Sequence, residues 1–302
     1  MVSCRLEAGS VDAAALHPEL NCTGVSSYYR ACADARQRLK EILRQELQLE
    51  HDLFLVTNTT HALLAVAAGL ASSGMILDAR HSGYPPFAAL PSAPDVASED
   101  RIRLITHVNP ITGEISFVPD AREQFAVVDA AQSFGTINHH VHALHSSVLL
   151  APLHKHSGIS TGLGLLSLRK ALVPSNLHVF ASIAEEGTMD FNLLMRAEER
   201  IKSIDFKIIN CMILSVTTDF VELLRDRGIE MLTPLGAGLP FLCFRGLPPD
   251  EAARATCGLG LSVKYFREHN VTRISGAVRG RLGGAVLDLG VDLERALLAH
   301  LR

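Results

Sequence analysis

Residues 148–168 read V-L-L-A-P-L-H-K-H-S-G-I-S-T-G-L-G-L-L-S-L, with two apolar runs on either side of a His-Lys-His cluster. The runs at residues 148–151 and 164–168 are uncharged and have the length of buried strands. Similar short runs occur elsewhere in the first two thirds of the chain, with helical patterns between them. Strands that alternate with helices are typical of a mostly parallel sheet covered on both faces. The sequence therefore predicts an α/β fold.

The pattern of the whole chain predicts a large and a small domain. Strands are expected at residues 52–56, 75–77, 103–107, 125–128, 148–151, 164–168, 231–232, 240–244 and 261–265, and helices at residues 28–49, 59–70, 190–224 and 293–301. The pattern changes near residue 205. We therefore expect a large domain at residues 25–204, a smaller α+β domain at residues 205–302, and an N-terminal segment, residues 1–24, that contributes to the small domain or the site.

Charge and hydropathy exclude several classes of protein. The 302 residues contain 28 Lys and Arg against 32 Asp and Glu, without the basic stripe that nucleic-acid binding requires. The longest apolar run, Ala62 to Ala71, is shorter than the roughly 18 residues of a membrane-spanning helix. A hydrophobic content of 48% is too high for a disordered chain. We expect a folded protein that binds neither nucleic acid nor membrane.

The cysteines and the N-terminus favour a reducing compartment. The six cysteines, at positions 4, 22, 32, 211, 243 and 257, form neither a C-x-x-C pair nor a regular disulfide framework. Residues 1–10 contain Arg5 and Glu7 and lack the apolar core of a secretory signal. A cytoplasmic location is therefore the expectation.

Three polar clusters follow predicted strands, where open α/β sheets bind ligands. The first, Thr57-Asn58-Thr59-Thr60, begins a helix. Free N–H groups at a helix start, together with two hydroxyls, form a site suited to phosphate. A Thr that merely caps the helix is the alternative.

The other two clusters contain a carboxylate and an amine. Asp129 is the last residue of an apolar run, and a buried carboxylate there requires a cation or a hydrogen-bond donor. A plain turn residue at the strand end is the alternative. Lys155 lies in the sequence Leu153-His154-Lys155-His156 after another apolar run. Near buried surface its pKa would fall, which makes the amine a usable nucleophile; a solvated loop lysine is the alternative.

The three clusters belong to a set of four motifs that occur in a fixed order along the chain. They are T-N-T-T-H-A at residues 57–62, T-H-V-N-P-I-T-G at 106–113, V-D-A-A-Q-S-F-G at 128–135, and His154-Lys155 followed by G-L-G at 162–164. The ordered set resembles the aminotransferase class V family, which includes cysteine desulfurases, kynureninases and isopenicillin-epimerase-like proteins. This resemblance implies a homodimeric enzyme of fold type I that uses pyridoxal 5'-phosphate on a small amino acid.

The resemblance also implies a role for each matching residue. Lys155 would form the internal aldimine and then serve as general base at Cα, while Asp129 would pair with the pyridine nitrogen. The other cofactor contacts would come from Thr59 and Thr60 at the phosphate, His154 beside them, Gln132 at the phenolic oxygen, Thr188 from a second subunit, and His81 (or Tyr84) stacked on the ring as a further catalytic group. The substrate contacts would come from Asn21, Asn109 and the two-pronged Arg273.

Two departures from the family pattern bear on the reaction. Pro152 stands where many members have a Ser that contacts the phosphate. No cysteine lies between Lys264 and Arg273, where a desulfurase would carry its thiol. The sequence therefore disfavours a desulfurase and leaves a lyase, an aminotransferase or an epimerase open. A catalytically idle relative that serves as a binding subunit is the alternative.

Three rival sites are weaker. Residues 158–162 match the G-x-S-x-G elbow of hydrolases, but a helix must follow Ser160 and residues 163–168 favour a strand. His139, His140, His142 and His145 are accompanied by no cysteine or clustered carboxylate, so we expect surface histidines and no metal site. A nicotinamide fold is disfavoured because no G-x-G-x-x-G follows a strand.

Overall fold

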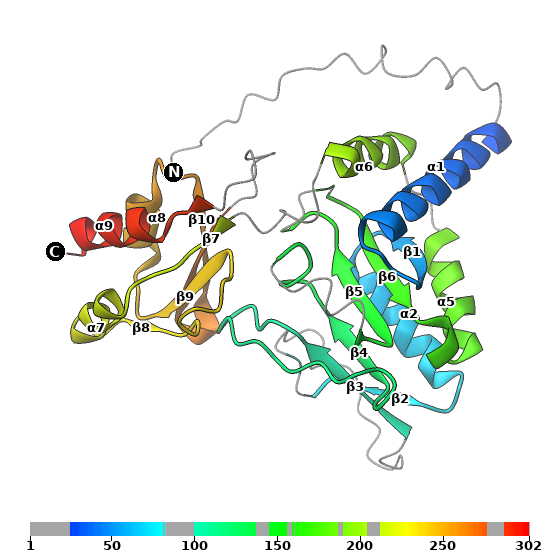
Figure 1. Ribbon diagram of the computed structural model, residues 1–302, viewed down its shortest axis with the longest axis horizontal. Coiled ribbons are helices and arrows are strands. Elements are labelled where there is room, and N and C mark those ends of the chain that lie inside the picture. The colour runs from blue at the N-terminus through cyan, green and yellow to red at the C-terminus, as the bar shows by residue number, and fades with distance from the viewer. Residues whose placement is uncertain are drawn as a thin grey trace.

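The computed structural model describes residues 25–80, 82, 100–136, 145–155, 159, 161–186, 190–203, 212–276 and 287–301. These residues form a large sheet and a small sheet, each with its own helices (Figure 1). Several predicted residues lie outside this part of the chain: Asn21, His81, Tyr84, His139, His140, His142, His156, Ser160 and Thr188.

The large sheet contains six strands in the order β1-β6-β5-β4-β3-β2. They are β1 (Asp52–Val56), β2 (Ile76–Asp78), β3 (Arg101–Thr106), β4 (Ala126–Asp129), β5 (Val148–Pro152) and β6 (Gly164–Leu168). Strands β2 to β5 pair in parallel, and β6 runs antiparallel to both β1 and β5. The predicted mostly parallel α/β sheet is therefore confirmed.

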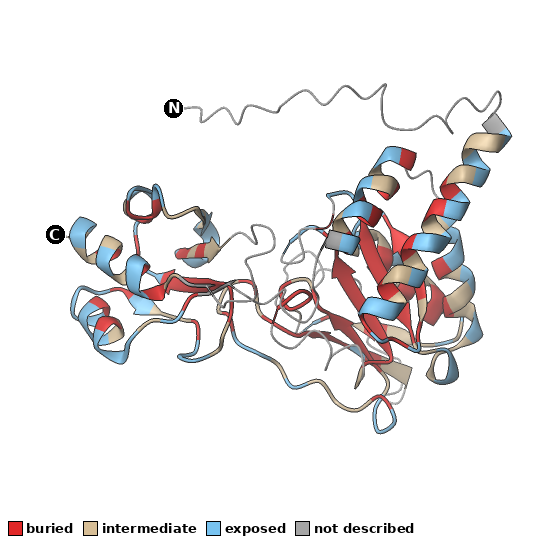
Figure 2. Cartoon of the chain, turned by 45° about the horizontal axis from the view of Figure 1, so that its top comes forward, coloured by how far each residue is buried: buried red, intermediate tan, exposed pale blue. Residues whose placement is uncertain are grey.

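Helices cover both faces of the large sheet (Figure 1). Helices α1 (Val25–Glu46) and α6 (Phe191–Ser203) lie on one face, and α2 (Thr59–Ala71) and α5 (Ser175–Glu186) lie on the other. Along β1, Leu53 and Leu55 join the first core, whereas Phe54 and Val56 join the second. This alternation buries the strands on both sides, as Figure 2 shows for the sheet as a whole.

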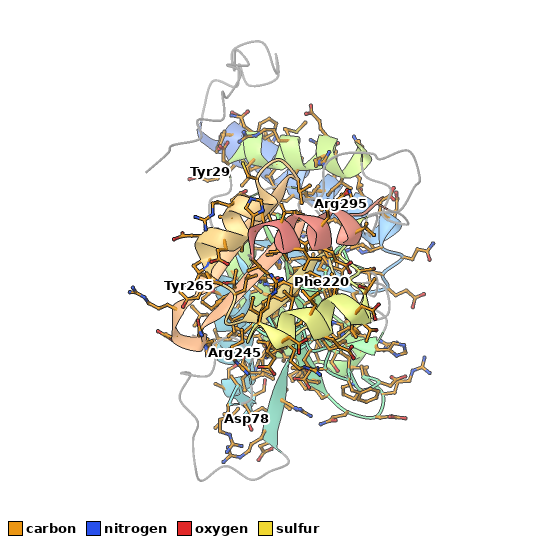
Figure 3. The ribbon with its side chains drawn as sticks, turned by 90° about the vertical axis from the view of Figure 1, so that its left-hand side faces the viewer. Tyr29, Asp78, Phe220, Arg245, Tyr265 and Arg295 are labelled. Atoms are coloured by element: carbon orange, nitrogen blue, oxygen red, sulfur yellow. The ribbon has the colours of Figure 1, made fainter. Side chains whose placement is uncertain are left out.

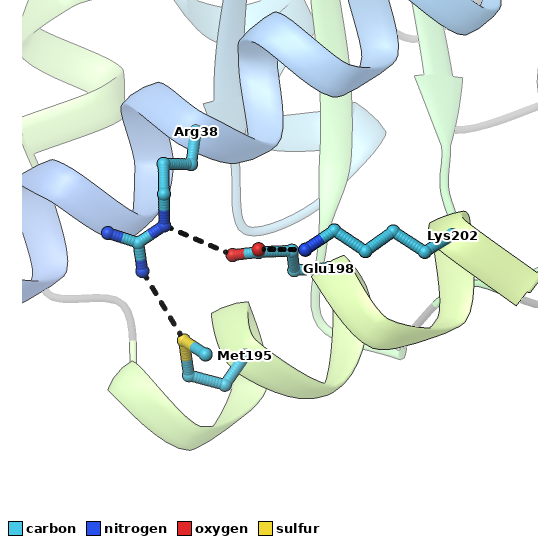
Figure 4. Close-up of polar contacts among 4 residues, drawn as sticks. All are labelled: Arg38, Met195, Glu198 and Lys202. Atoms are coloured by element: carbon cyan, nitrogen blue, oxygen red, sulfur yellow. Dashed lines mark hydrogen bonds and ion pairs between the residues drawn. The ribbon is translucent and has the colours of Figure 1, made fainter.

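Polar contacts tie α1 to α6 along their exposed edge (Figure 4). Glu198 accepts a hydrogen bond from Arg38 Nε at 3.3 Å and another from Lys202 Nζ at 2.6 Å. Arg38 also donates to the sulfur of Met195 at 3.6 Å. Because these pairs are partly solvated, their contribution to stability is small beside that of the leucines beneath them, such as Leu39 and Leu43.

The small sheet is antiparallel, in the order β10-β11-β9-β8. Its strands are β8 (Glu230–Met231), β9 (Phe241–Arg245), β10 (Leu261–Phe266) and β11 (Val271–Gly276), and its helices are α7 (Thr218–Asp226), α8 (Pro249–Thr256) and α9 (Gly290–His300). Phe244 and Ile274 pack with the helices in one core. Phe241, Cys243 and Val271 point to the other face and pack against Val108, which follows β3 of the large sheet.

Four short elements complete the described fold. β7 (Met212–Ile213) and β12 (Leu287–Asp288) form a two-stranded parallel sheet. The 3-10 turns η4 (Lys170–Leu172) and η5 (Arg267–His269) follow β6 and β10.

Among the described residues, none of the helices is long and apolar enough to cross a membrane.

The predicted long helix at residues 190–224 is wrong. Helix α6 ends at Ser203, β7 follows, and a new helix begins after Thr217, whose hydroxyl accepts a hydrogen bond from Phe220 N at 3.2 Å. A side-chain cap of this kind starts a helix locally, whatever periodicity precedes it. The predicted domain boundary at residue 205 falls in residues 204–211, outside the described chain.

Candidate functional site

A cavity of about 570 Å³ lies between the large sheet and the β10–β11 hairpin. One wall is built from strand ends and the start of α2, and the opposite wall from the hairpin of the small sheet. The lining residues are Thr59, Thr60, Thr106, Val108, Pro110, Ile111, Asp129, Ala131, Gln132, Lys155, Lys264, Phe266, Arg267, Glu268, His269 and Arg273. Six of the residues predicted from the sequence are therefore brought together: Thr59, Thr60, Asp129, Gln132, Lys155 and Arg273.

Helix α2 begins at the cavity wall. Its N-cap is Asn58, whose side chain accepts a hydrogen bond from His61 N at 2.8 Å, so the alternative of a Thr cap is wrong. Thr59 and Thr60 are the first helical residues, and N–H groups in a first turn have no partner within the helix. Gly164 lies close beneath, because a Cβ there would come within 3.1 Å of the Asn58 carbonyl carbon. The two threonines therefore present hydroxyls and a helix N-terminus to the cavity.

Asp129 is the last residue of β4 and is 4% exposed. Its Oδ1 accepts a hydrogen bond from Ala131 N at 2.9 Å. Desolvation by burial raises the pKa of this carboxyl above its usual range, against the opposing effects of that hydrogen bond and of Lys155. A cation placed in the cavity beside Asp129 would reverse the effect of burial and stabilise the carboxylate.

Lys155 follows β5, and its side chain is reached by solvent through the cavity. The protein around it is nevertheless dense enough that desolvation lowers the pKa of the amine. Asp129 acts in the opposite direction, and the cations Arg273 and Lys264 lower the pKa further. A lysine with a lowered pKa supplies more neutral amine, which is the nucleophilic form.

Arg273 reaches across from β11 to residues that follow β3 and β4 of the large sheet. Its Nη1 donates to the Pro110 carbonyl at 3.3 Å and to Gln132 Oε1 at 3.4 Å. The guanidinium carbon also lies 5.3 Å from the centre of the Phe241 ring. The Nε atom is buried and makes no hydrogen bond to the described residues. The contacts of Nη1 therefore hold the side chain in place at the cavity wall.

The other predicted residues have different places. Asn109 is not among the described residues that line the cavity; its Oδ1 accepts hydrogen bonds from Ile111 N at 2.9 Å and Thr112 N at 3.2 Å, which holds a turn. His154 is exposed as a residue, but the surrounding protein partly desolvates its ring. This desolvation, followed by the charge of Lys155, lowers the pKa of His154. The roles predicted for Asn21, His81, Thr188 and His154 stay predictions.

On the hairpin side of the cavity, sequence reasoning identified Arg273 and missed five other residues. Lys264, Phe266, Arg267, Glu268 and His269 line it from β10 and η5. The signal was present as two alternating runs, residues 261–266 and 271–276, around the polar turn R-E-H-N, which is typical of a hairpin. Lys264 lies directly opposite Arg273 in this hairpin.

The rival sites gain no support from the described residues. The segment after Ser160 is strand β6, whereas a hydrolase elbow needs a helix there. For the histidine cluster, His145 Nδ1 lies 3.7 Å from Asp120 Oδ2, and both side chains are partly exposed. Among the described residues, no group of three or more His, Cys, Asp or Glu side chains is placed to hold a metal ion.

A family profile covers nearly the whole chain. The profile of the family of unknown function DUF6024 matches residues 11–299. The chain belongs to this family. No curated protein matches it in sequence.

Solved structures share its fold. Aspartate aminotransferase of subgroup IV from Thermus thermophilus superposes with a TM-score of 0.59 at 17% identity, over 95% of this chain and 97% of the other. Cysteine desulfurase from Thermococcus onnurineus NA1 gives 0.57 at 17% identity, over 89% and 84%. Serine palmitoyltransferase from S. paucimobilis, with a bound PLP–myriocin aldimine, gives 0.57 at 12% identity, over 88% and 77%. This member of DUF6024 therefore has the fold of the type I pyridoxal-phosphate-dependent transferases.

Proposed function

We propose that this protein binds pyridoxal 5'-phosphate and acts on an amino acid as a transferase or a lyase. One observation carries the proposal: a buried carboxyl group, a lysine amine and the N-terminus of a helix line a single cavity. They belong to Asp129, Lys155 and Thr59–Thr60. The fold shared with enzymes of this class supports it.

The donor set fits the cofactor group by group. The Thr59 and Thr60 hydroxyls and the first N–H groups of α2 suit a phosphate dianion. Asp129 suits a protonated ring nitrogen, because a cation offsets the cost of burying its charge. Lys155 lines the same cavity, and its amine would bond the aldehyde carbon. Pro152 offers no donor to the phosphate, so Thr59 and Thr60 carry that role in our proposal.

The residues of the chain then divide the work. When bound, the cofactor draws electrons away from the α-carbon of the amino acid through its protonated ring. Asp129 keeps the ring nitrogen protonated, and Gln132 contacts the ring. Arg273 binds the α-carboxylate, and Lys155 moves the proton at Cα, where a lowered pKa suits a general base. His81, Thr188, Asn21 and His154 keep the roles predicted for them. Asn109 holds the turn that carries Pro110 and Ile111 in the cavity wall, so its role at the substrate is indirect.

The reaction type follows partly from what the hairpin lacks. Residues 265–272 between Lys264 and Arg273 contain no cysteine, so this segment offers no thiol to accept sulfur. We therefore propose an aminotransferase or a lyase and not a desulfurase. A homodimer, a cytoplasmic location, a large domain at residues 25–204 and a small domain at 205–302 complete the proposal.

Absorbance spectroscopy tests it. Purified protein mixed with pyridoxal phosphate should develop the visible band of lysine-bound cofactor, and Lys155→Ala should not. Lys170→Ala removes a lysine outside the cavity and serves as the matched control, which should keep the band. Protein that develops no band, or a Lys155→Ala variant that keeps it, would refute the proposal.

A further inference from the structure

The charges that line the cavity exceed what the cofactor and a simple amino acid require. Four lining side chains are cationic (Lys155, Lys264, Arg267 and Arg273) and two are carboxyl groups (Asp129 and Glu268). In the proposed function, on which this inference rests, Lys155 and Asp129 engage the cofactor and Arg273 binds the α-carboxylate. Lys264 and Arg267 then remain against Glu268, which leaves one positive charge without a counterpart.

The surplus cation is Lys264, beside Arg273. The two residues are direct partners in the β10–β11 register, and cross-strand partners have Cβ atoms about 4.5–5.5 Å apart. The ring of Phe266 contacts both: its centre lies 4.9 Å from Lys264 Nζ and 5.5 Å from Arg273 Cζ. Both cations therefore reach the same patch of the cavity wall.

Like charges in this arrangement repel each other. Directly opposed charges of the same sign destabilise an antiparallel pair, and in the described part of the chain neither Lys264 nor Arg273 forms an ion pair. Burial is the main cause of the lowered pKa of Lys155, and the two cations lower it further. A dianion would relieve this repulsion more completely than a single carboxylate.

We propose that the substrate is an acidic amino acid, whose α-carboxylate binds Arg273 and whose side-chain anion binds Lys264. The side-chain anion can be a carboxylate or a phosphate ester, because an ammonium group binds either as a point charge. Lys264 is in this account a specificity-determining residue and takes no part in proton transfer.

Pairs of amino acids that differ only in charge test the proposal. The cofactor-loaded protein is titrated with L-glutamate against L-glutamine and with L-aspartate against L-asparagine, and the change in visible absorbance gives each dissociation constant. O-phospho-L-serine against L-serine separates phosphate from carboxylate. We expect the charged member of at least one pair to bind about tenfold more tightly or better, as a charge-assisted contact gives.

Three variants locate the effect. Lys264→Ala should abolish the preference for the charged amino acid and change the affinity for its uncharged counterpart by no more than about twofold. Lys264→Arg keeps the positive charge and should retain most of the preference. Arg245→Ala removes a positive charge from the same sheet, at an exposed residue paired with Glu230 and labelled in Figure 3, and should retain the preference in full. Equal affinities in the unaltered protein, or equal weakening of both members by Lys264→Ala, would overturn the inference.

A second measurement separates this inference from the proposed function. Calorimetric titration of the cofactor-free protein with succinate and with butyrate compares a dianion and a monoanion of equal carbon number. Tighter succinate binding that is lost in Lys264→Ala supports the cation pair whether or not the cofactor binds. A visible cofactor band without any acid preference would refute the inference alone, whereas the absence of the band would refute the proposed function.

Discussion

At the scale of single residues, the site depends on groups kept in unfavourable surroundings. Burial raises the pKa of Asp129, which has one backbone donor, and burial together with the nearby cations Arg273 and Lys264 lowers the pKa of Lys155. Both shifts favour the uncharged form of the group. Groups with perturbed pKa values that share a cavity are typical of functional sites. A ligand with a cationic ring nitrogen beside Asp129 and an aldehyde carbon that bonds the neutral amine of Lys155 would satisfy both groups at once.

The effect of burial on Asp129 predicts how stability varies with pH. A carboxyl whose pKa is raised in the folded state favours folding below its usual pKa of about 4, and this contribution is lost as the pH rises through the raised value. The cofactor-free Asp129→Asn variant has no carboxyl at this position, so it does not lose this stability as the pH rises. Its stability relative to the unaltered protein should therefore rise with pH, by about 1.4 kcal/mol for each unit by which the pKa is raised.

Urea unfolding at a series of pH values measures this difference, and Asp120→Asn is the control. The Asp120 carboxyl has its pKa lowered, chiefly by the hydrogen bond from Arg122 N, so its loss should change the relative stability with pH in the opposite direction. A stability difference for Asp129→Asn that is flat or falls with pH would contradict the burial argument.

At the scale of elements, the start of α2 links fold and site. Asn58 caps the helix, Thr59 and Thr60 follow in the cavity wall, and Gly164 of the neighbouring strand allows close approach beneath. The β10–β11 hairpin plays the same part on the opposite side. Each element brings a polar end to the cavity while its apolar part is packed in a core.

The cap makes a measurable contribution. Asn58→Ala removes the acceptor for His61 N and should lower the free energy of unfolding by about 1 kcal/mol, a usual cost for the loss of an N-cap. Denaturant unfolding measures it. Asn58→Asp keeps a capping oxygen and should stay close to the unaltered protein; an Asn58→Ala variant of unchanged stability would show that the cap is not needed.

How far the sequence predicts the structure differs between elements. Strands β1 and β6 occupy the predicted residues, because short uncharged runs between turns have few alternatives. The prediction of a single helix from Asp190 to Leu224 was wrong, because the helical periodicity of the sequence continues across strand β7 and across the new N-cap at Thr217. Strand β11 was not predicted, although the alternating run at residues 271–276 is typical of a strand.

At the scale of the whole molecule, the two sheets face each other across the cavity, and Arg273 spans the gap to Pro110 and Gln132. The cavity residues that follow strands of the large sheet could be predicted, because the ends of such strands meet at one edge. Lys264 and Phe266 could not, since their place depends on how the small sheet docks. Local patterns carry no information about such docking.

The central claim is that Lys155 bonds pyridoxal phosphate inside this cavity. The most direct measurement is reduction of the cofactor-loaded protein with borohydride, followed by digestion and mass spectrometry of the peptides. The account predicts that the pyridoxyl phosphate group is found on Lys155. A label on Lys264, the other lysine of the cavity wall, or the absence of any labelled peptide would contradict it.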